Sequence, residues 1–267
     1  MSIAVIIPAR NAERVIGRTL AALEGADEVL VVDNGSRDDT SKIAAGHGAR
    51  VVRHRRPSRP GARNAGASST KAGKLLFLDA DCVPDPGWAI HLARALDEHD
   101  LAAGRTIVAG TGSPAARFDT LWRLRQEDTI AQGWAGSGNL AIRRPLFDRL
   151  GGFDTRFTKA GEDVDLCLRA GRLGYAPQAI VRHAPASTTE EVLRRGFRHG
   201  FGATQLHHRH QGRIGRQDWK HPRPLVAGDW VLERFGLADH PELKGIAKAD
   251  YAGRVIGSAW AELRRAR

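Results

Sequence analysis

The sequence is poor in the features that mark several common classes of protein. Its 267 residues include 2 cysteines, 1 methionine and 2 tyrosines. Cys82 and Cys167 form no CxxC pair and supply no disulfide framework, which is typical of a reducing compartment. No apolar run approaches the roughly 18 residues that span a bilayer. The first residues also lack the basic leader and apolar region of a signal peptide, so we expect a cytoplasmic protein without a transmembrane segment.

Two familiar nucleotide-binding loops are missing as well. The first apolar run, Ile3 to Ile7, leads into Pro8-Ala9-Arg10-Asn11, which fits neither GxxxxGK[ST] nor GxGxxG. A Walker loop and a dinucleotide loop are therefore excluded at this position. Any nucleotide that binds near the end of this run must be held in another way.

The composition indicates a folded globular chain with an excess of positive charge. Hydrophobic residues make up 42% of the sequence and charged residues 27%, and the formal net charge is +11. The length suits one large α/β domain, or one domain with a trailing subdomain. The charge favours anionic partners, which include nucleotides, acidic glycans, phospholipid surfaces and nucleic acid, and it does not choose among them.

Apolar runs alternate with helical patterns over the first part of the chain. The sequence predicts strands at 3–7, 28–32, 49–53 and 75–78, with Asn11 and Ser36 as the N-caps of the helices that follow the first two. This alternation predicts a parallel sheet covered by helices, whose strands all end at one edge. Three polar segments meet at that edge, namely Pro8-Ala9-Arg10, Asp33-Asn34-Gly35-Ser36 and Asp79-Ala80-Asp81.

The last of these segments indicates a metal site. Asp79 and Asp81 follow the buried run Leu75 to Leu78 and are separated by one alanine. Carboxylates at the end of a buried strand lose hydration and repel each other unless a cation meets them. A divalent cation bound by carboxylate oxygens relieves both costs.

Three later segments carry further candidates, each with a purely structural alternative. Residues 133–138 form a glycine-rich loop before a predicted strand, where glycines would let the backbone approach a ligand and would equally suit a tight turn. Glu162 and Asp163 begin a helix, where the helix dipole alone favours acidic residues. His183 ends a short strand, and a single histidine in such a place is more often structural than a ligand.

The chain becomes basic and rich in histidine after residue 187. Thr188 and Glu191 match a capping box at the start of a long helix. His207 and His210 have a spacing that would allow a shared metal, but neighbouring arginines repel cations, so a basic face for an anionic acceptor is the preferred interpretation. The last predicted helix, 252–266, mixes apolar and basic residues. Packing on the catalytic domain, docking on an anionic membrane and an oligomer contact all stay open for this helix.

Seven segments in order resemble the family 2 glycosyltransferases of the GT-A fold. They are VIIPARNAE, VVDNGSRDDT, ARNAG, LFLDADC, GSGNLAIRR, GEDVDLCLR and VRH, and they span Ile3 to His183. The resemblance implies an inverting transferase that moves a sugar from a nucleotide diphosphate to an acceptor hydroxyl. It also implies an α/β fold with a mostly parallel central sheet flanked by helices, here followed by a mainly helical C-terminal extension.

The resemblance assigns metal and donor residues by position. Asp79-Ala80-Asp81 matches the D-x-D motif, so Asp81 would bind Mn²⁺ or Mg²⁺, and Asp79 would hold the ribose or a metal-bound water. His183 matches the histidine that often completes the metal site, which tilts the preference toward Mn²⁺. The residues that match the family's contacts to the nucleotide-sugar, with UDP as the favoured nucleotide, are Pro8, Ala9, Arg10, Glu13, Asp33, Arg63, Gly138 and Asn139.

The acidic pair at the start of the later helix matches the catalytic motif of the family. Asp163 would act as the general base that takes the acceptor proton, and Glu162 is the second choice or a group that orients the acceptor. One departure is Asn34, where the family often has a second acidic residue, so contacts to the base or ribose should differ there. We interpret Cys82 as a small buried residue, because an inverting single displacement needs no protein nucleophile.

We therefore predict a metal-dependent, inverting glycosyltransferase with a catalytic domain at 1–186 and a helical extension at 187–267. The nucleotide half of the catalytic domain covers about 1–104 and the acceptor half about 105–186. The donor sugar stays open, and so does the acceptor, which is a glycan, a small molecule or a lipid-linked sugar. Peripheral membrane contact and a homo-oligomer also stay open.

Two other classes of protein remain as alternatives to this prediction. A sugar-nucleotide nucleotidyltransferase would also use paired aspartates, but its glycine-rich signature is missing after the first strand. A non-catalytic module that binds anions or nucleic acid would explain the positive charge. We expect no nucleic acid partner, because aromatic residues, which such modules interleave with basic ones, make up 6% of the chain.

Overall fold

The structure of the protein, a computed structural model, describes residues 1–108, 112–122, 126–210, 230–235 and 237–265. The chain forms two compact units, each described by itself below. Unit 1 comprises residues 1–107, 125–156 and 162–183, and unit 2 comprises residues 108–124, 157–161 and 184–267. The predicted division of the chain into domains at 186/187 stays a prediction.

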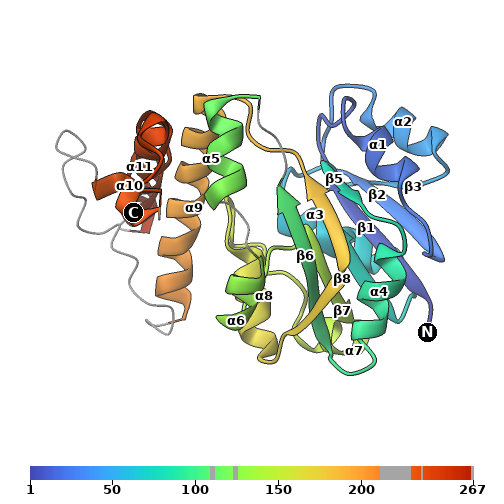
Figure 1. Cartoon of the computed structure of the whole chain (residues 1–267). Helices are drawn as coiled ribbons and strands as arrows, with labels where there is room; N and C mark the ends of the chain where they lie inside the picture. Colours follow the sequence, from blue (N-terminus) through green and yellow to red (C-terminus); the bar gives the residue numbers. More distant parts are fainter. Residues whose placement is uncertain (109–111, 123–125, 211–229, 236, 266–267) are drawn as a thin grey trace. The chain divides into compact units, whose positions relative to one another are not determined.

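Unit 1 is built on an eight-stranded sheet with the order β3-β2-β1-β4-β7-β6-β8-β5 (Figure 1). Strands β1 to β4 are parallel to their neighbours among these four, whereas β7 runs antiparallel to β4 and β6. The predicted sheet, mostly parallel and flanked by helices, is confirmed. The strands are β1 (Ile3–Ala9), β2 (Glu28–Asp33), β3 (Arg50–Arg53), β4 (Lys74–Leu78), β5 (Cys82–Pro84), β6 (Leu101–Val108), β7 (Asn139–Arg143) and β8 (Gly174–His183).

Alternate residues of the central strands pack against helices on both faces of the sheet. Val5 and Ile7 of β1 join an apolar core with α1, α2 and α4, while Ala4 and Ile6 join a second core with α3, α7 and α8. Because both faces are covered, the strand is a continuous apolar run rather than an alternating one. The helices of unit 1 are α1 (Ile16–Ala21), α2 (Thr40–Gly46), α3 (Arg59–Ser68), α4 (Trp88–Ala95), α6 (Gln126–Ala131), α7 (Arg144–Arg149) and α8 (Glu162–Ala170).

The first two helices begin later than the sequence predicted. The N-cap of α1 is Val15 and that of α2 is Asp39, so the predictions of Asn11 and Ser36 as N-caps are wrong. Asn11 has a φ of 51°, and its side chain accepts a hydrogen bond from Arg37 N at 2.9 Å. Ser36 Oγ accepts one from Asn11 N at 3.1 Å. Both side chains therefore tie the loop after β1 to the loop after β2 instead of starting a helix.

Two strands begin earlier than the sequence predicts, and one strand was not predicted at all. The sequence predicts strands at 105–109 and 179–183, whereas β6 begins at Leu101 and β8 at Gly174. The short strand β5 was not predicted, and it places Cys82 directly opposite His183 in an antiparallel pair. This pairing matters for the site, because it brings the residues after the D-x-D motif next to a histidine about 100 residues away in the sequence.

Unit 2 is helical in its described residues. Its helices are α5 (Pro114–Trp122), α9 (Thr189–Arg209), α10 (Trp230–Arg234) and α11 (Lys244–Arg265), with a short 3-10 turn at Pro241–Leu243. The predicted N-cap of α9 is confirmed, because the side chain of Thr188 accepts a hydrogen bond from Glu191 N at 3.2 Å. The return bond of a capping box is shifted, since the Glu191 carboxylate accepts from Ser187 N instead.

Helices α9 and α11 lie side by side and run in the same direction. Gly200 packs on the backbone of Arg254, and one turn further on the hydroxyls of Thr204 and Ser258 are 2.6 Å apart. Glycine at the first of these positions allows the backbones to approach closely. The two helices are each more than 20 residues long, yet no helix in the part of the chain that the structure describes is long and apolar enough to cross a membrane.

Candidate active site

Polar side chains gather at one edge of the sheet in unit 1. The carboxyl ends of β1, β2 and β4 lie there because these strands are parallel, and β7 begins there because Leu78 pairs with Asn139. The D-x-D segment leaves β4 at this edge, and the pairing of Cys82 with His183 brings in the end of β8. The segments that the sequence predicted to meet therefore share one edge, the usual location of ligands in wound α/β folds.

A buried arginine holds two of the acidic residues at this edge. Arg63 of α3 is 3% exposed, and its guanidinium donates to Asp79 Oδ1 and to Glu162 Oε1, each at 2.9 Å. The guanidinium also lies over the ring of Phe153, 5.5 Å from the ring centroid. Charge-assisted hydrogen bonds of this kind are strong and directional. Arg63 therefore fixes the D-x-D segment relative to the start of α8.

The D-x-D segment is also held by its neighbours. Thr19 Oγ1 donates to the carbonyl of Ala80 at 2.8 Å, and a Cβ at Gly138 would lie 2.9 Å from Asp79 Oδ2. A side chain at position 138 would therefore press on this carboxylate, and glycine lets the glycine-rich loop approach it closely. Burial acts most strongly and raises the pKa of Asp79, but the charges of Arg63, Arg59 and His183 and the hydrogen bond from Arg63 together hold that pKa below its ordinary value.

Asp163 occupies a different electrostatic position from its neighbours. Its Oδ2 accepts a hydrogen bond from Ser137 N at 3.2 Å, and its Oδ1 accepts one from Val164 N at 2.9 Å. Burial, and next the negative charge of Glu162, raise the pKa of Asp163 to about 6, although Arg63 acts in the opposite direction. A carboxylate with this pKa is more basic than an ordinary aspartate and is still mostly ionised at neutral pH, as a general base must be.

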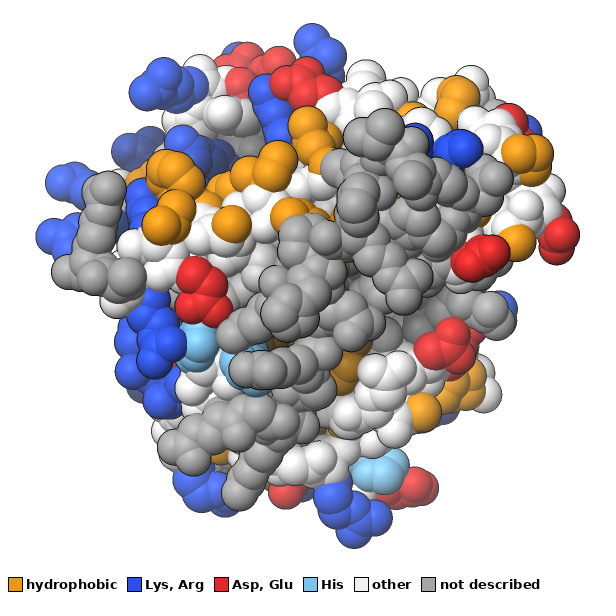
Figure 2. Space-filling view, turned by 90° about the vertical axis from the view of Figure 1, so that its left-hand side faces the viewer, with side chains coloured by type: hydrophobic (Ala, Val, Ile, Leu, Met, Phe, Trp, Pro, Cys, Tyr) orange, Lys and Arg blue, Asp and Glu red, His pale blue; other side chains and the backbone are white. Residues whose placement is uncertain are grey.

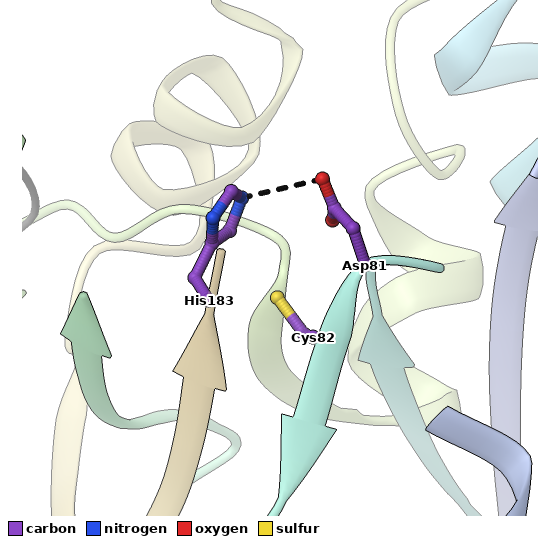
Figure 3. Close-up of side chains that lie close together, drawn as sticks. All are labelled: Asp81, Cys82 and His183. Atoms are coloured by element: carbon purple, nitrogen blue, oxygen red, sulfur yellow. Dashed lines mark ion pairs between the residues drawn. The ribbon is translucent and has the colours of Figure 1, made fainter. Parts of the chain in front are cut away.

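Three side chains with metal-binding atoms lie together at the same edge (Figure 3). Asp81 Oδ2 is 3.6 Å from His183 Nε2, and the side chains of these two residues point toward each other. Cys82 Sγ lies within 4.8 Å of both ligand atoms and is buried, whereas Asp81 is exposed. Carboxylate oxygen and imidazole nitrogen suit Mn²⁺ and accept Mg²⁺, while a thiolate would favour softer ions.

The carboxylate predicted to bind the nucleotide base is held in a turn after β2. Asp33 accepts hydrogen bonds from Ser36 N at 2.8 Å and from Ser41 Oγ at 2.6 Å. Partial burial acts to raise the pKa of Asp33, but these hydrogen bonds outweigh it and lower that pKa. The next residue, Asn34, is buried and accepts a hydrogen bond from Ser58 N at 2.9 Å. Asn34 therefore anchors the start of α3, which explains why an amide can stand there in place of an acid.

The loop after β1 lies beside this turn. Ala9 pairs with Asp33 in the parallel register, and Pro8 precedes it in the strand. Arg10 is exposed at the end of the strand. Glu13 connects the two loops, since its Oε2 accepts a hydrogen bond from Asp39 N at 3.3 Å. The structure thus brings all four predicted residues of this loop to the edge where Asp33 lies.

The structure gives Asn139 a role inside the sheet. Its side chain is fully buried, donates to the carbonyls of Arg105 and Ala179 at 2.9 Å each, and accepts from Trp88 Nε1 at 2.8 Å. These bonds join β7 to β6 and β8. Contact of the amide itself with a donor sugar would break one of them, so the neighbouring Gly138 is the better placed of the two predicted residues.

The sequence did not predict two features of this site, namely the ion pairs of Arg63 and the position of Cys82. The predicted role of Arg63 was contact with base or diphosphate, whereas the structure shows its guanidinium bonded to two carboxylates. Cys82 joins Asp81 and His183 because of a strand register that sequence spacing does not reveal. In contrast, His207 and His210 join no group of three or more potential metal ligands among the described residues.

The chain is similar in sequence to known glycosyltransferases. The chain is 36% identical over 180 residues to an uncharacterized glycosyltransferase of Mycobacterium tuberculosis, which covers 65% of this chain and 81% of the relative. It is 28% identical over 228 residues to the glycosyltransferase AglE of Haloferax volcanii, with 76% of this chain and 73% of the relative covered.

A solved structure resembles this one at lower identity. Glucosyl-3-phosphoglycerate synthase from Mycobacterium tuberculosis, in complex with Mn²⁺, UDP and glucosyl-3-phosphoglycerate, superimposes with a TM-score of 0.58 at 22% identity. The alignment covers 78% of this chain and 79% of that one. At this level of identity the likeness shows the fold, which is of the GT-A kind that the resemblance implied.

The sequence also matches a protein family directly. The family described as Glycosyl transferase family 2 matches residues 4–155, a range that runs from the second residue of β1 past the end of β7 and contains the D-x-D segment. This range is more than half of the 267 residues. The chain therefore belongs to glycosyl transferase family 2 and is a glycosyltransferase.

Proposed function

We propose that this glycosyltransferase moves a sugar from a UDP-sugar to an acceptor hydroxyl with inversion, assisted by a divalent cation. The observation that carries the proposal is that the acidic residues at one sheet edge differ in exposure and in pKa. Asp81 faces His183 and is exposed, as a metal ligand would be, whereas Asp163 has a pKa of about 6, as a general base would have. Asp79 and Glu162 are fixed between them by Arg63.

The residues at Asp81 fit the cation that this reaction needs. One carboxylate oxygen and one imidazole nitrogen, 3.6 Å apart, are ligands that Mn²⁺ and Mg²⁺ both accept. Asp81 and His183 would hold the cation, and Asp79 would hold the ribose or a metal-bound water. When bound, the cation neutralises negative charge on the departing diphosphate. Solved structures of glucosyl-3-phosphoglycerate synthase contain Mn²⁺ or Mg²⁺ together with UDP, which supports this class of donor.

The loops after β1 and β2 supply the contacts to the nucleotide. Asp33 is suited to accept a hydrogen bond from the imino N–H of uracil, because its lowered pKa keeps it ionised at neutral pH. Arg10 is exposed at the end of β1 and provides positive charge next to the base and diphosphate. Pro8, Ala9 and Glu13 shape this loop.

Asp163 performs the proton transfer in the proposed reaction. As the acceptor oxygen attacks the anomeric carbon, the bond from that carbon to the diphosphate breaks on the opposite side and the configuration inverts. The acceptor proton passes to the Asp163 carboxylate, whose geometry is maintained by the N–H groups of Ser137 and Val164. Glu162 stays bonded to Arg63 and orients the start of α8.

A thermal-shift screen of nucleotide sugars with and without Mn²⁺ tests the donor and the cation together. A ligand that binds the native state raises the melting temperature according to its concentration and affinity. We expect UDP-sugars to give the largest shift, and we expect that shift to depend on Mn²⁺. Equal shifts with and without the cation would contradict the metal assignment, and a larger shift with another nucleotide would contradict the uracil assignment.

Two aspartate variants make the screen specific. Asp81→Asn should lose the Mn²⁺-dependent part of the shift and the metal-dependent hydrolysis of the donor. Asp85→Asn is the matched control, because Asp85 lies four residues further on and its carboxylate pairs with Arg182 at 2.7 Å instead of facing His183. The control should keep both responses. Retention of both by the Asp81 variant would rule out Asp81 as a metal ligand.

A further inference from the structure

The α9–α11 pair of unit 2 carries a row of large apolar side chains in solvent. On α11, Ile256, Trp260 and Leu263 are 55%, 48% and 63% exposed. Their spacing of four and then three residues places them on one face of the helix. Leu193 of the adjacent α9 is 37% exposed. A group of exposed large apolar residues indicates a contact surface, whereas isolated ones do not.

The packing of the two helices leaves this row on the outside. A Cβ at Gly253 would lie 2.2 Å from Leu193 O, and one at Gly257 would lie 2.0 Å from Phe197 O. Helix α11 therefore meets α9 through its glycines, at backbone-to-backbone distance. Ile256, Trp260 and Leu263 keep 55%, 48% and 63% of their surface in solvent, so the backbone contact of the two helices does not use that surface.

Basic side chains border the row at the end of α11. Arg264 and Arg265 are exposed, and the Arg264 guanidinium lies over the ring of Trp260, 5.9 Å from its centroid. The carboxylate in this turn, Glu262, is 3.0 Å from His208 Nε2 and so is engaged with the facing helix. The exposed surface of the last turns is consequently apolar and positively charged.

Figure 2 shows this face of the molecule, with hydrophobic side chains in a row and a dense group of Lys and Arg side chains beside it. On α9, Arg194 is exposed and pairs with Glu190 one turn before it. An apolar face with tryptophan at its centre and arginines along its border is typical of helices that lie in the plane of a lipid surface. Tryptophan favours the headgroup level, and arginine favours anionic headgroups.

The charges favour a lipid surface over a second copy of the chain. A symmetric dimer through this row would bring the same patch of each copy together. Each copy carries a formal net charge of +11, so two copies would meet with like charge and nothing in the contact would neutralise the arginines that border the row. An anionic lipid surface instead supplies negative charge around the whole row. The formal net charge of +11 acts in the same direction.

We propose that the exposed face of α11 formed by Ile256, Trp260 and Leu263, with Arg264 and Arg265 at its border, docks this protein on anionic lipid membranes. The apolar side chains enter the region between headgroups and acyl chains, and the arginines contact the phosphates. This proposal does not rest on the donor, the cation or the general base proposed above.

Co-sedimentation of the full chain with lipid vesicles tests the proposal. We expect binding to vesicles of phosphatidylcholine with about a third phosphatidylglycerol and much weaker binding to phosphatidylcholine alone. Raising the salt from about 0.1 M to about 0.5 M should weaken the binding, because the headgroup attraction is screened. Trp260→Ser with Leu263→Ser should reduce the partition coefficient at least about tenfold, since two large apolar side chains no longer leave water.

Matched controls separate this face from a general effect of hydrophobicity or charge. Leu121→Ser removes a side chain that is 41% exposed on α5, and Arg172→Glu reverses an exposed charge in unit 1. Both should bind vesicles like the wild type, whereas Arg264→Glu with Arg265→Glu should lose at least about tenfold in binding to anionic vesicles. The charge reversal leaves the apolar row intact, so it remains decisive if the serine variant folds poorly.

Several results would overturn the proposal. Equal binding to the two kinds of vesicle, or no binding to either, would do so. Wild-type binding by the Trp260 and Leu263 variant would exclude this face. A dimer in light scattering that the same variant converts to a monomer, without any vesicle binding, would assign the face to a second copy. Donor-dependent thermal shifts measured in parallel keep a failure of docking distinct from a failure of the proposed activity.

Discussion

Arg63 in unit 1 and Arg195 in unit 2 are both 3% exposed, and they differ in the acids that surround them. Arg195 donates through both of its amino groups to the two oxygens of Asp119, which is fully buried. The same carboxylate accepts a hydrogen bond from Ala186 N at 2.7 Å. The guanidinium thus bonds both oxygens of a single carboxylate, and these bonds join α9 and the segment before it to α5.

Around Arg63 the charges do not balance. Its positive charge is shared by Asp79, Glu162 and Asp163, and the pKa of Asp163 rises to about 6 in consequence of burial and of the Glu162 charge. In a buried ion pair with matched charges neither charge is left uncompensated. A cluster with excess negative charge can instead accept a proton or lie next to a cation. This difference fits a structural role for the Arg195 pair and the proposed catalytic role for the acids around Arg63.

The largest expected effect is on the rate of the reaction. Asp163→Asn should lower kcat about 10²–10⁴-fold, the usual contribution of a general base, and should leave the dissociation constant of UDP nearly unchanged. Isothermal titration and steady-state kinetics measure the two quantities. Glu162→Gln is the internal comparison, and we expect it to lower kcat less. A Glu162 variant with the greater loss of kcat would transfer the role of base to Glu162.

The second expected effect is on stability. Asp119→Ala leaves the Arg195 guanidinium buried without its carboxylate, so the free energy of unfolding should fall by about 3–5 kcal/mol. Urea unfolding followed by circular dichroism measures this change. Replacement of both residues, as Asp119→Leu with Arg195→Met, should recover much of the loss because no charge is then left unpaired. A single variant as stable as the wild type would show that the pair is not structural.

Some features of the site around Arg63 could be predicted from the sequence and others could not. The common edge of Ala9, Asp33 and Asp79 was predictable, because alternating strands and helices make a parallel sheet whose strand ends coincide. The D-x-D segment was predictable for the same reason, together with its charge. The ion pair between Arg63 and Glu162 was not, since 99 residues separate them and no local pattern reports such a contact.

Local patterns failed where side chains bond across loops. Asn11 and Ser36 are good N-cap residues by type, yet they bond to each other's loops over 25 residues or more. The start of β6 was missed because Leu101-Ala102-Ala103-Gly104 has no β-branched residue, and only its burial in the sheet makes it a strand. The lowered pKa of Asp33 and the raised pKa of Asp163 also depend on contacts in the folded chain, so the sequence alone could not predict these shifts.

Loss of a buried arginine and loss of a buried aspartate should respond differently to pH. Arg63→Met leaves several carboxylates without their counter-charge, and the free energy of unfolding at pH 8 should fall by about 1–3 kcal/mol. Lowering the pH toward 5 should recover part of this loss, because the carboxylates can take up protons. Asp119→Ala should not recover in acid, since the stranded guanidinium of Arg195 keeps its charge. Urea unfolding at the two pH values measures both, and equal recovery of the two variants would contradict the comparison.

The smallest expected effect is a change of the free energy of unfolding with pH that comes from Asp163 alone. Its pKa is about 6 in the folded protein and near the ordinary 3.8 in the unfolded chain. The folded state therefore binds this proton more readily, and the contribution of Asp163 to stability falls as the pH rises from about 4 to about 6. Partial exposure screens the effect, so we expect a loss on the order of 1–2 kcal/mol.

This loss appears as a difference between the wild type and Asp163→Asn, measured by urea unfolding in EDTA from pH 4 to pH 8. The variant should lack it, because an amide does not titrate in this range. The proposed base acts only when it is ionised, so we expect kcat/KM to fall as the pH drops below about 6. If the stability difference and kcat/KM titrate with the same pKa, the carboxylate cluster around Arg63 takes part in the reaction. A rate profile that titrates with another pKa would mean that the raised pKa of Asp163 is a by-product of burial and that a different group accepts the proton.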